Sequence, residues 1–473
     1  MIVVGAIQFL ILLVALVRGK ALALMLGPEG VGVVGTVDQF IVTVAQFSAL
    51  GLPFAAMKAM SAAHSQSDEA FRRTFATFAR MILFISAIVV LVAAGSETLA
   101  HAAFGALGGY RDVLMLALFA APPMMMTILV AHTFASAQLP RTAAAYNLVF
   151  AAVPAAAALA GAALGGVWGF YLGTVVAGAA VIGAALIWLH QRLGVHVLDR
   201  GVPLRGRGGG AGLVVGTAVS AYANLVSASA LLLLVRYVVL DSEGEATVGL
   251  LQSALGVALS AGSILATLSS LHLAPSLNRT TAPEEKFRST DRFARATAFY
   301  MLLGAVPVAL LPGLVLTILY TGSFVGAGML LVLSLIWQGL WLLMTAYSHL
   351  LIGVDRPMAA TATTLVSVAA GAASAFLLVD TWGAIAAPLA LILTAVVKVG
   401  LMLAVLVRRE GMPMPWGVLA RFLAISAAIG GPALLFDISV TLPDAAGFGY
   451  RALYALAVIG LMWGWNRPGR NPG

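Results

Sequence analysis

Four basic side chains lie inside apolar stretches that are long enough to cross a lipid bilayer: Arg18, Lys20, Arg236 and Lys398. Asp38 is the only acidic residue in the same setting. A charged group at the bilayer centre costs about 2.5–3.5 kcal/mol on insertion scales, so such groups persist mainly where they face a partner or a watery cavity. Arginine and lysine can replace the hydration of a phosphate by charge-assisted hydrogen bonds. The pattern therefore predicts a site for an anionic ligand partway across a membrane.

The composition is that of a polytopic membrane protein. Hydrophobic residues make up 61% of the chain and charged residues only 9%, with a mean hydropathy of +1.02. A soluble protein of 473 residues could not hide that much apolar surface. The net charge of +8 comes mostly from basic residues in short loops, a distribution that indicates membrane topology rather than nucleic-acid binding.

The sequence contains no constellation typical of an enzyme or a metal site. The absence of cysteine excludes disulfides, thiolate zinc sites and cysteine nucleophiles. The histidines are scattered and form no HExxH pattern. The GRGGG run at 206–210 is not a phosphate loop, because no strand precedes it and no Lys-Ser/Thr closes it. We therefore expect no metal, no cofactor and no enzymatic activity.

Apolar stretches of about 20 residues or more indicate an all-α fold of about fourteen transmembrane helices. Their abundant Ala and Gly suit close packing of helices in lipid. The predicted spans run near 2–26, 31–57, 74–94, 112–137, 142–165, 167–190, 212–237, 247–272, 293–320, 324–352, 358–379, 383–407, 416–436 and 447–465.

The distribution of basic residues predicts the orientation. With the N-terminus inside, nearly all loop arginines and lysines fall on the cytoplasmic side, and only Arg111 and Arg451 fall outside. This orientation places both termini in the cytoplasm and requires Arg18 and Lys20 to lie within a retained first span. Arg18 then lies about 13 Å from Gly27 along the helix, close to the middle of the membrane.

The chain also repeats itself after six spans. FRRTFATFAR at 71–80 resembles FRSTDRFAR at 287–295, and Val17-Arg18 has a counterpart in Val235-Arg236. Trp168-Gly169 similarly has a counterpart in Trp382-Gly383. Because six is even, the copies share one orientation, as in transporters that work by alternating access with a substrate path between the halves. The predicted domains are a six-helix lobe at 1–190, a cytoplasmic linker at 191–211, a second six-helix lobe at 212–407 and two extra helices with a short tail at 408–473, with a central cavity between the lobes.

Two motifs in the first part of the chain suggest a family. LGPEGVG at 26–32 and SALGLPFAAMKAMS at 48–61 resemble the opening of Wzx-type oligosaccharide flippases. These flippases are a branch of the multidrug/oligosaccharidyl-lipid/polysaccharide exporter superfamily, which also contains the lipid II flippases. The resemblance implies a flippase that moves an undecaprenyl-diphosphate-linked oligosaccharide from the inner to the outer leaflet of a bacterial plasma membrane. It would serve O-antigen, capsule or exopolysaccharide synthesis, with polysaccharide polymerase and glycosyltransferases as its partners.

The resemblance also implies a central cavity whose basic residues receive the diphosphate. Arg18 on the first helix fits this pattern, Arg236 is its repeat counterpart, and Lys398 fits by chemistry and depth, whereas Lys20 lies nearer the outer edge and could snorkel. Two alternatives concern these charges: Arg18 and Asp38 could form a structural ion pair, and Arg236 could snorkel. The polar residues predicted either to bind sugar hydroxyls or to form interhelical hydrogen bonds are Gln39, Gln46, Asn224 and Gln252.

Other functions remain open at this point. A drug or cation antiporter of the same superfamily would need acidic cavity residues, and Asp38 alone qualifies against four basic groups. A membrane-embedded glycan polymerase or glycosyltransferase would need sizeable polar loops. The predicted outer loops of this chain are short. A scaffold without transport activity is a further alternative, but it would not explain the charged interior.

Overall fold

The computed structural model describes residues 2–49, 52–95, 110–197, 211–269, 273, 277, 282–437, 441 and 443–465. Within these ranges the chain is helical and contains no strand, as the sequence predicts. It divides into two compact units, Met1–Glu245 and Ala246–Gly473. Most of the predicted linker, at 198–210, lies outside the described residues, and the predicted lobe boundaries stay a prediction.

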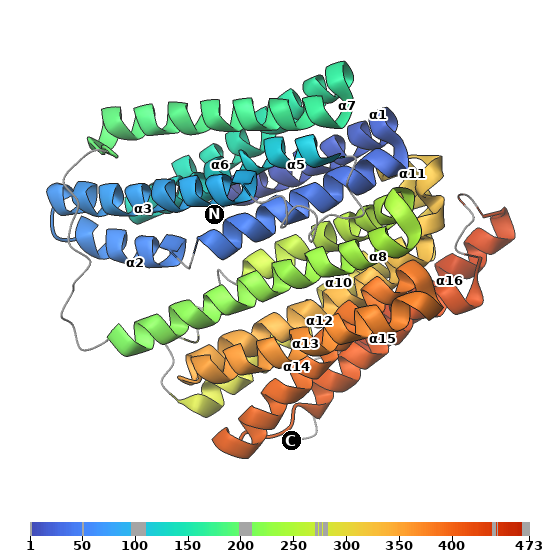
Figure 1. Cartoon of the computed structure of the whole chain (residues 1–473). Helices are drawn as coiled ribbons and strands as arrows, with labels where there is room; N and C mark the ends of the chain where they lie inside the picture. Colours follow the sequence, from blue (N-terminus) through green and yellow to red (C-terminus); the bar gives the residue numbers. More distant parts are fainter. Residues whose placement is uncertain are drawn as a thin grey trace. The chain divides into compact units, whose positions relative to one another are not determined.

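The first unit contains helices that are too long to be single membrane crossings. At 1.5 Å per residue, the 47 residues of α1 would span about 70 Å, against about 30 Å of hydrocarbon. Figure 1 shows that α1 and α7 each fold back as two arms joined by a sharp bend. The unit consists of α1 (Ile2–Ser48), α2 (Leu52–His64), α3 (Asp68–Gly95), α5 (Arg111–Leu118), α6 (Ala121–Ser136), α7 (Pro140–Leu193) and the part of α8 (Ala211–Leu268) up to Glu245.

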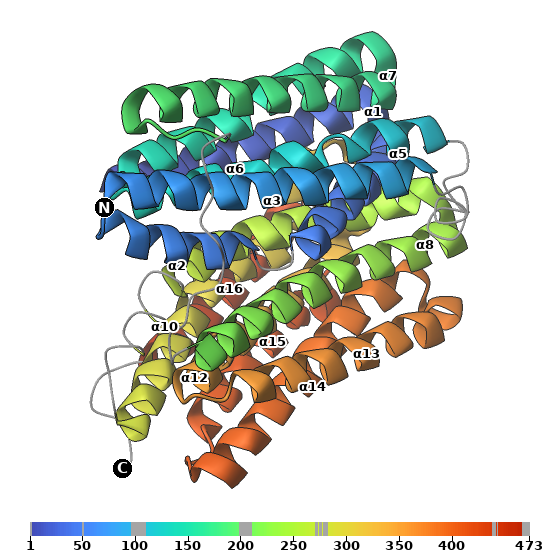
Figure 2. The ribbon, with the colours of Figure 1, turned by 60° about the vertical axis from the view of Figure 1, so that its left-hand side comes forward.

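The bend of α7 depends on glycine. Gly166 has a left-handed backbone (φ 57°, ψ −142°) that residues with a side chain rarely adopt. The arms before and after the bend contact each other through their backbones. A Cβ on Gly161 would lie 2.0 Å from the carbonyl oxygen of Gly169. A Cβ on Gly173 would lie 2.2 Å from the carbonyl oxygen of Ala157. The arms are therefore antiparallel and lie side by side (Figure 2). Small residues allow this close approach.

The backbone carries the internal repeat more clearly than the sequence does. The described part of the chain has eight residues with positive φ, six glycines together with Gln138 and Asp355. They form four pairs in which the second member always follows the first by 217 residues: Gly27 and Gly244, Gln138 and Asp355, Gly166 and Gly383, Gly194 and Gly411.

The paired residues also adopt similar conformations. Gly27 and Gly244 have φ of 64° and 84° with ψ near 180°, and Gly166 and Gly383 have φ of 57° and 54° with ψ of −142° and −138°. The same bends thus recur at one constant spacing, as expected of a duplicated fold. The predicted match of Trp168-Gly169 with Trp382-Gly383 is wrong by three residues, because Gly166 is the backbone equivalent of Gly383.

The second unit begins with the end of α8 and adds two helices beyond the repeat. Its α13 and α14 pack so closely that a Cβ on Gly371 would lie 1.8 Å from the Thr394 hydroxyl oxygen. The remaining elements are α10 (Pro283–Leu310), α11 (Pro312–Leu319), η3 (Gly322–Ala327), α12 (Gly328–Gly353), α13 (Pro357–Trp382), η4 (Gly383–Ile385), α14 (Ala386–Glu410), α15 (Trp416–Leu435) and α16 (Ala445–Trp465).

Nine helical segments among the described residues are long and apolar enough to cross a membrane, and Ala445–Gly460 forms a shorter apolar helix. The longest of these segments contain bends, and the count of fourteen spans stays a prediction. Three predicted spans, 31–57, 112–137 and 293–320, are wrong as continuous helices. They break after Ser48, Leu118 and Leu310, shortly before Pro53, Pro122 and Pro312. Proline lacks an N–H and therefore begins a new helix instead of continuing the old one.

The last helix is attached to α10 through Arg451, which the sequence analysis counted on the outer side. The side chain lies in α16 and is buried. It donates hydrogen bonds to the carbonyl oxygens of Leu310 (2.9 Å) and Asp437 (2.6 Å), and its guanidinium lies 5.5 Å from the centre of the Phe436 ring. Leu310 ends α10, so Arg451 satisfies a carbonyl that has no partner within its own helix.

Replacing Arg451 with methionine should destabilise the protein by about 1–3 kcal/mol, because the buried hydrogen bond to Leu310 and the part-buried one to Asp437 lose their charged donor. The measurement is the thermal unfolding midpoint of the purified protein in detergent. Arg409→Met, at an exposed position of α14, is the matched control and should leave the midpoint unchanged. Equal midpoints for Arg451→Met and wild type would show that these hydrogen bonds do not hold α16 in place.

Candidate anion-binding site

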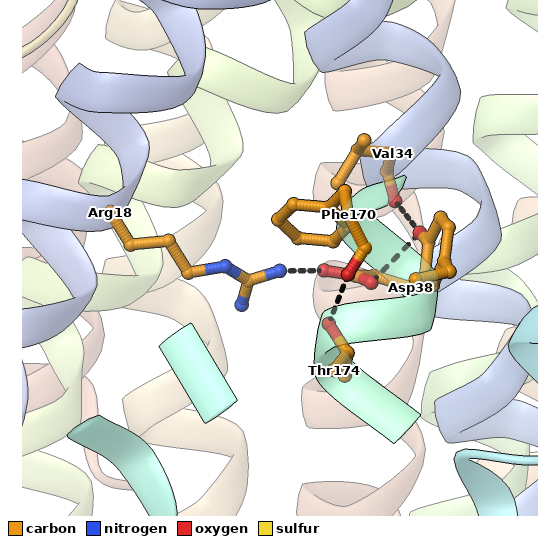
Figure 3. A network of polar contacts seen from close by, with 6 residues as sticks. Arg18, Val34, Asp38, Phe170 and Thr174 are labelled. Atoms are coloured by element: carbon orange, nitrogen blue, oxygen red, sulfur yellow. Dashed lines mark hydrogen bonds and ion pairs between the residues drawn. The ribbon is translucent and has the colours of Figure 1, made fainter. Parts of the chain in front are cut away.

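The two arms of α1 bring Arg18 and Asp38 together. Arg18 precedes the bend at Gly27 and Asp38 follows it, so the antiparallel arms place the two side chains opposite each other. A guanidinium nitrogen of Arg18 lies 2.6 Å from Oδ2 of Asp38 (Figure 3). The ion pair considered from the sequence is therefore present.

Helix α7 contributes two aromatic residues to this pair. The hydroxyl of Tyr171 lies 2.9 Å from Oδ1 of Asp38 and 3.0 Å from the carbonyl oxygen of Val34. The Phe170 ring lies beneath the Arg18 guanidinium, with 5.0 Å between Cζ and the ring centre, a cation–π contact. Both aromatic side chains are fully buried. They form an edge-to-face pair, and the Phe170 carbonyl accepts a hydrogen bond from Thr174 (Figure 3). The buried side chains of Phe170 and Tyr171 thus contact the guanidinium and the carboxylate respectively.

The ion pair itself is partly exposed. The side chain of Arg18 is 32% exposed and that of Asp38 is 35% exposed. The Nε–H of Arg18 is buried and has no hydrogen-bond acceptor among the described residues. A guanidinium has five N–H donors, so Arg18 could donate to an anionic ligand in place of Asp38 without leaving the ring of Phe170.

A second arginine lies on α8 in the same unit. Arg236 is 2% exposed and donates a hydrogen bond to the Leu232 carbonyl oxygen at 2.7 Å. Its guanidinium is buried and does not extend to an aqueous edge, whereas a snorkelling arginine would expose its guanidinium. The Asp38 carboxylate interacts electrostatically with both Arg18 and Arg236. One carboxylate thus interacts with two cations. Arg18, Arg236 and Asp38 together therefore carry a net positive charge.

Hydrogen bonds tie α1 to the same part of α8. The Gln39 amide and the Thr43 hydroxyl each donate to the Ser229 carbonyl oxygen, both at 3.2 Å, and the Tyr222 hydroxyl donates to the carbonyl oxygen of Phe47. Gln39 therefore forms the interhelical hydrogen bond expected of such a residue.

The remaining candidate residues are distributed over both units. Lys20, Gln46 and Asn224 are half-buried in the first unit, and Oε1 of Gln46 has no partner among the described residues. Gln252 and Lys398 belong to the second unit, where Lys398 is 4% exposed on α14. The structure thus gathers Arg18, Asp38 and Arg236 in one place and leaves Lys398 inside the other unit.

The sequence did not identify Tyr171 and Phe170. They lie more than 130 residues from Asp38 along the chain, and WGFY reads as an ordinary interfacial aromatic cluster. The sequence signal that could have identified them is the pair Gly165-Gly166 just before them. These glycines form the bend of α7 and so determine where the second arm of that helix begins.

Comparison with known proteins finds solved structures that have a similar fold. Neither a protein-family model nor a curated protein sequence matches the chain. Among solved structures, the lipid II flippase MurJ in an inward closed conformation matches with a TM-score of 0.68 at 12% identity, and 98% of each chain is covered. An inward-facing multidrug resistance MATE family transporter of the MOP superfamily matches with a TM-score of 0.63 at 15% identity, covering 92% of this chain and 99% of that one.

The chain shares its fold with these solved structures. A third solved structure, a ligand complex of the MATE multidrug transporter DinF-BH, is similar at a TM-score of 0.54 and 18% identity, with 86% of this chain and 94% of that one covered. The predicted class, an all-helical polytopic membrane protein, is therefore confirmed. At these identities the likeness defines the fold alone, and the Wzx-type branch stays a prediction.

Proposed function

We propose that the protein is a flippase that moves an undecaprenyl-diphosphate-linked oligosaccharide from the inner to the outer leaflet of a bacterial plasma membrane. The observation that carries the proposal is the partly exposed Arg18 guanidinium, held on Phe170 within a helix hairpin of a MOP fold. Alternating access would carry the headgroup across while the lipid chain stays in the bilayer.

The chemistry of the site suits a diphosphate. Arg18 offers a planar fork of donors to phosphate oxygens, and Arg236 adds positive potential nearby. In this proposal Lys20 and Lys398 supply further positive charge to the headgroup path. The amides that would bind sugar hydroxyls are Gln39, Gln46, Asn224 and Gln252.

The cellular setting follows from the substrate. The N- and C-termini would face the cytoplasm, where glycosyltransferases complete the lipid-linked sugar. A polymerase would receive the product on the outer side. The protein would act as a transporter and not as an enzyme.

A drug or cation antiporter is the second candidate. It is favoured by the 35% exposed carboxylate of Asp38 and by the fold likeness to MATE multidrug transporters. However, Asp38 already pairs with Arg18, and the group is positively charged overall. A cationic ligand would therefore be repelled, which makes an anionic ligand the better match.

The test is a reconstitution of the purified protein in liposomes. Fluorescently labelled undecaprenyl-diphosphate oligosaccharide should become accessible to a membrane-impermeant quencher at a rate well above that of protein-free liposomes. Efflux of a cationic rhodamine dye driven by a proton or sodium gradient should not exceed that of protein-free liposomes. No acceleration of lipid movement, or gradient-driven dye efflux alone, would overturn the flippase proposal.

A further inference from the structure

Asp38 occupies the place that an anionic ligand of Arg18 would take. Its Oδ2 accepts a hydrogen bond of 2.6 Å from a nitrogen of the partly exposed Arg18 guanidinium. The opposite face of Arg18 rests on Phe170, a contact that does not depend on which anion the arginine binds. A ligand can therefore replace the carboxylate without moving the cation.

The carboxylate has other partners to stabilise it after such a replacement. Tyr171 donates to Oδ1 at 2.9 Å and is immobilised by burial, and Arg236 also interacts electrostatically with Asp38. The ionised carboxylate would thus keep the nearby Arg236 cation, and it would lose the Tyr171 hydrogen bond where it shifts away from Arg18.

The Tyr171 hydroxyl can also adjust. A phenol has a single proton to donate, and two acceptors lie within reach, Asp38 at 2.9 Å and the Val34 carbonyl oxygen at 3.0 Å. Because the second acceptor is in place, Tyr171 is satisfied whether or not the carboxylate shifts. The hydroxyl therefore holds Asp38 next to Arg18 without locking it there.

We propose that Asp38 is an internal competitor for the anion site of Arg18, positioned by Tyr171, which weakens binding of the diphosphate and promotes its release. The inference rests on the proposed function and deepens it, because it assigns the release step to a residue of the protein. Binding transfers Arg18 from the carboxylate to the phosphate, and departure of the ligand restores the ion pair. Tight binding alone would trap the substrate, since a transporter must also release it.

Binding of two soluble probes to the purified full-length protein in detergent tests this inference. Inorganic pyrophosphate represents the free anion and geranyl diphosphate represents a lipid-linked headgroup. Asp38→Asn, which keeps a hydrogen-bonding side chain without the charge, should bind geranyl diphosphate about tenfold more tightly than wild type. The double variant Asp38→Asn/Arg18→Ala should lose this gain. Asp38→Glu, which keeps the competing charge, should bind like wild type.

Tyr171→Phe tests the positioning role. Loss of one of the two hydrogen bonds to the carboxylate should raise affinity by a smaller factor, about two- to fivefold, with no further effect in the Asp38→Asn background. A merely structural tyrosine would lower the unfolding midpoint and leave the affinity unchanged, and that result would overturn its assigned role.

The outcomes separate the inference from the proposed function. A gain in Asp38→Asn that requires Arg18 supports the inference, including the case in which wild-type binding is too weak to detect. Wild-type binding with an equal or lower affinity in Asp38→Asn overturns the inference and leaves the flippase proposal intact. Failure of both wild type and Asp38→Asn to bind either probe overturns both. Equal gains for the two probes would show that the headgroup alone is recognised, and a gain confined to geranyl diphosphate would show that the lipid contributes.

Discussion

Replacing Arg18 with alanine is expected to slow translocation of the lipid-linked oligosaccharide in liposomes by about tenfold or more, equivalent to about 1.4 kcal/mol of lost stabilisation. The reason is geometric. The guanidinium is partly exposed, rests on the Phe170 ring and pairs with the Asp38 carboxylate. Alanine removes the charge and the fork of donors, so the diphosphate would have to leave water without compensation.

Two further variants make this result interpretable. Arg18→Lys keeps the charge but not the planar fork, and should fall between alanine and wild type. Arg73→Ala removes an arginine from an exposed ion pair with Glu69 on α3 and should leave the rate unchanged. Wild-type translocation by a folded, correctly inserted Arg18→Ala protein would rule out a role of Arg18 in substrate binding.

The second large effect concerns the hairpin that supplies Tyr171 and Phe170. Replacing Gly161 with leucine should destabilise the protein by about 3 kcal/mol or more, because even a Cβ there would lie 2.0 Å from the Gly169 carbonyl oxygen. The arms of α7 would have to separate. We expect a lower thermal unfolding midpoint in detergent and a smaller monodisperse fraction on size exclusion.

Gly183→Leu is the matched control for this substitution. It lies in the same helix and exchanges the same residue types, but a Cβ at Gly183 meets no atom within 4 Å. If the two variants had the same midpoint, the loss of stability would come from lower helix flexibility or altered hydrophobicity and not from the contact between the arms.

The broad fold could be read from the chain because its determinants are local. Hydropathy over about 20 residues defines a membrane span, and a basic residue inside such a span is visible without knowledge of its neighbours. Motif order also revealed that the chain repeats. The breaks before Pro53, Pro122 and Pro312 were missed because hydropathy alone does not register the missing N–H of proline.

The pairing of Arg18 with Asp38 could be anticipated for the same reason. Both lie within one helix hairpin, at comparable distances from the bend at Gly27, so the spacing along the chain translates directly into depth. By contrast, the 217-residue spacing of the bends became evident only from the backbone angles. The spacings of the matched sequence motifs differ from this value by up to three residues.

The sequence by itself thus determined that this is an all-helical membrane protein with a duplicated chain and cations in its apolar segments, since composition and periodicity fix burial in lipid one segment at a time. Only the tertiary structure decided what surrounds those cations. Tyr171 and Phe170 reach Arg18 and Asp38 because the bend at Gly166 sets the depth of an arm more than 130 residues away. Contacts of that kind depend on how hairpins pack against each other, and no local property of the chain encodes them.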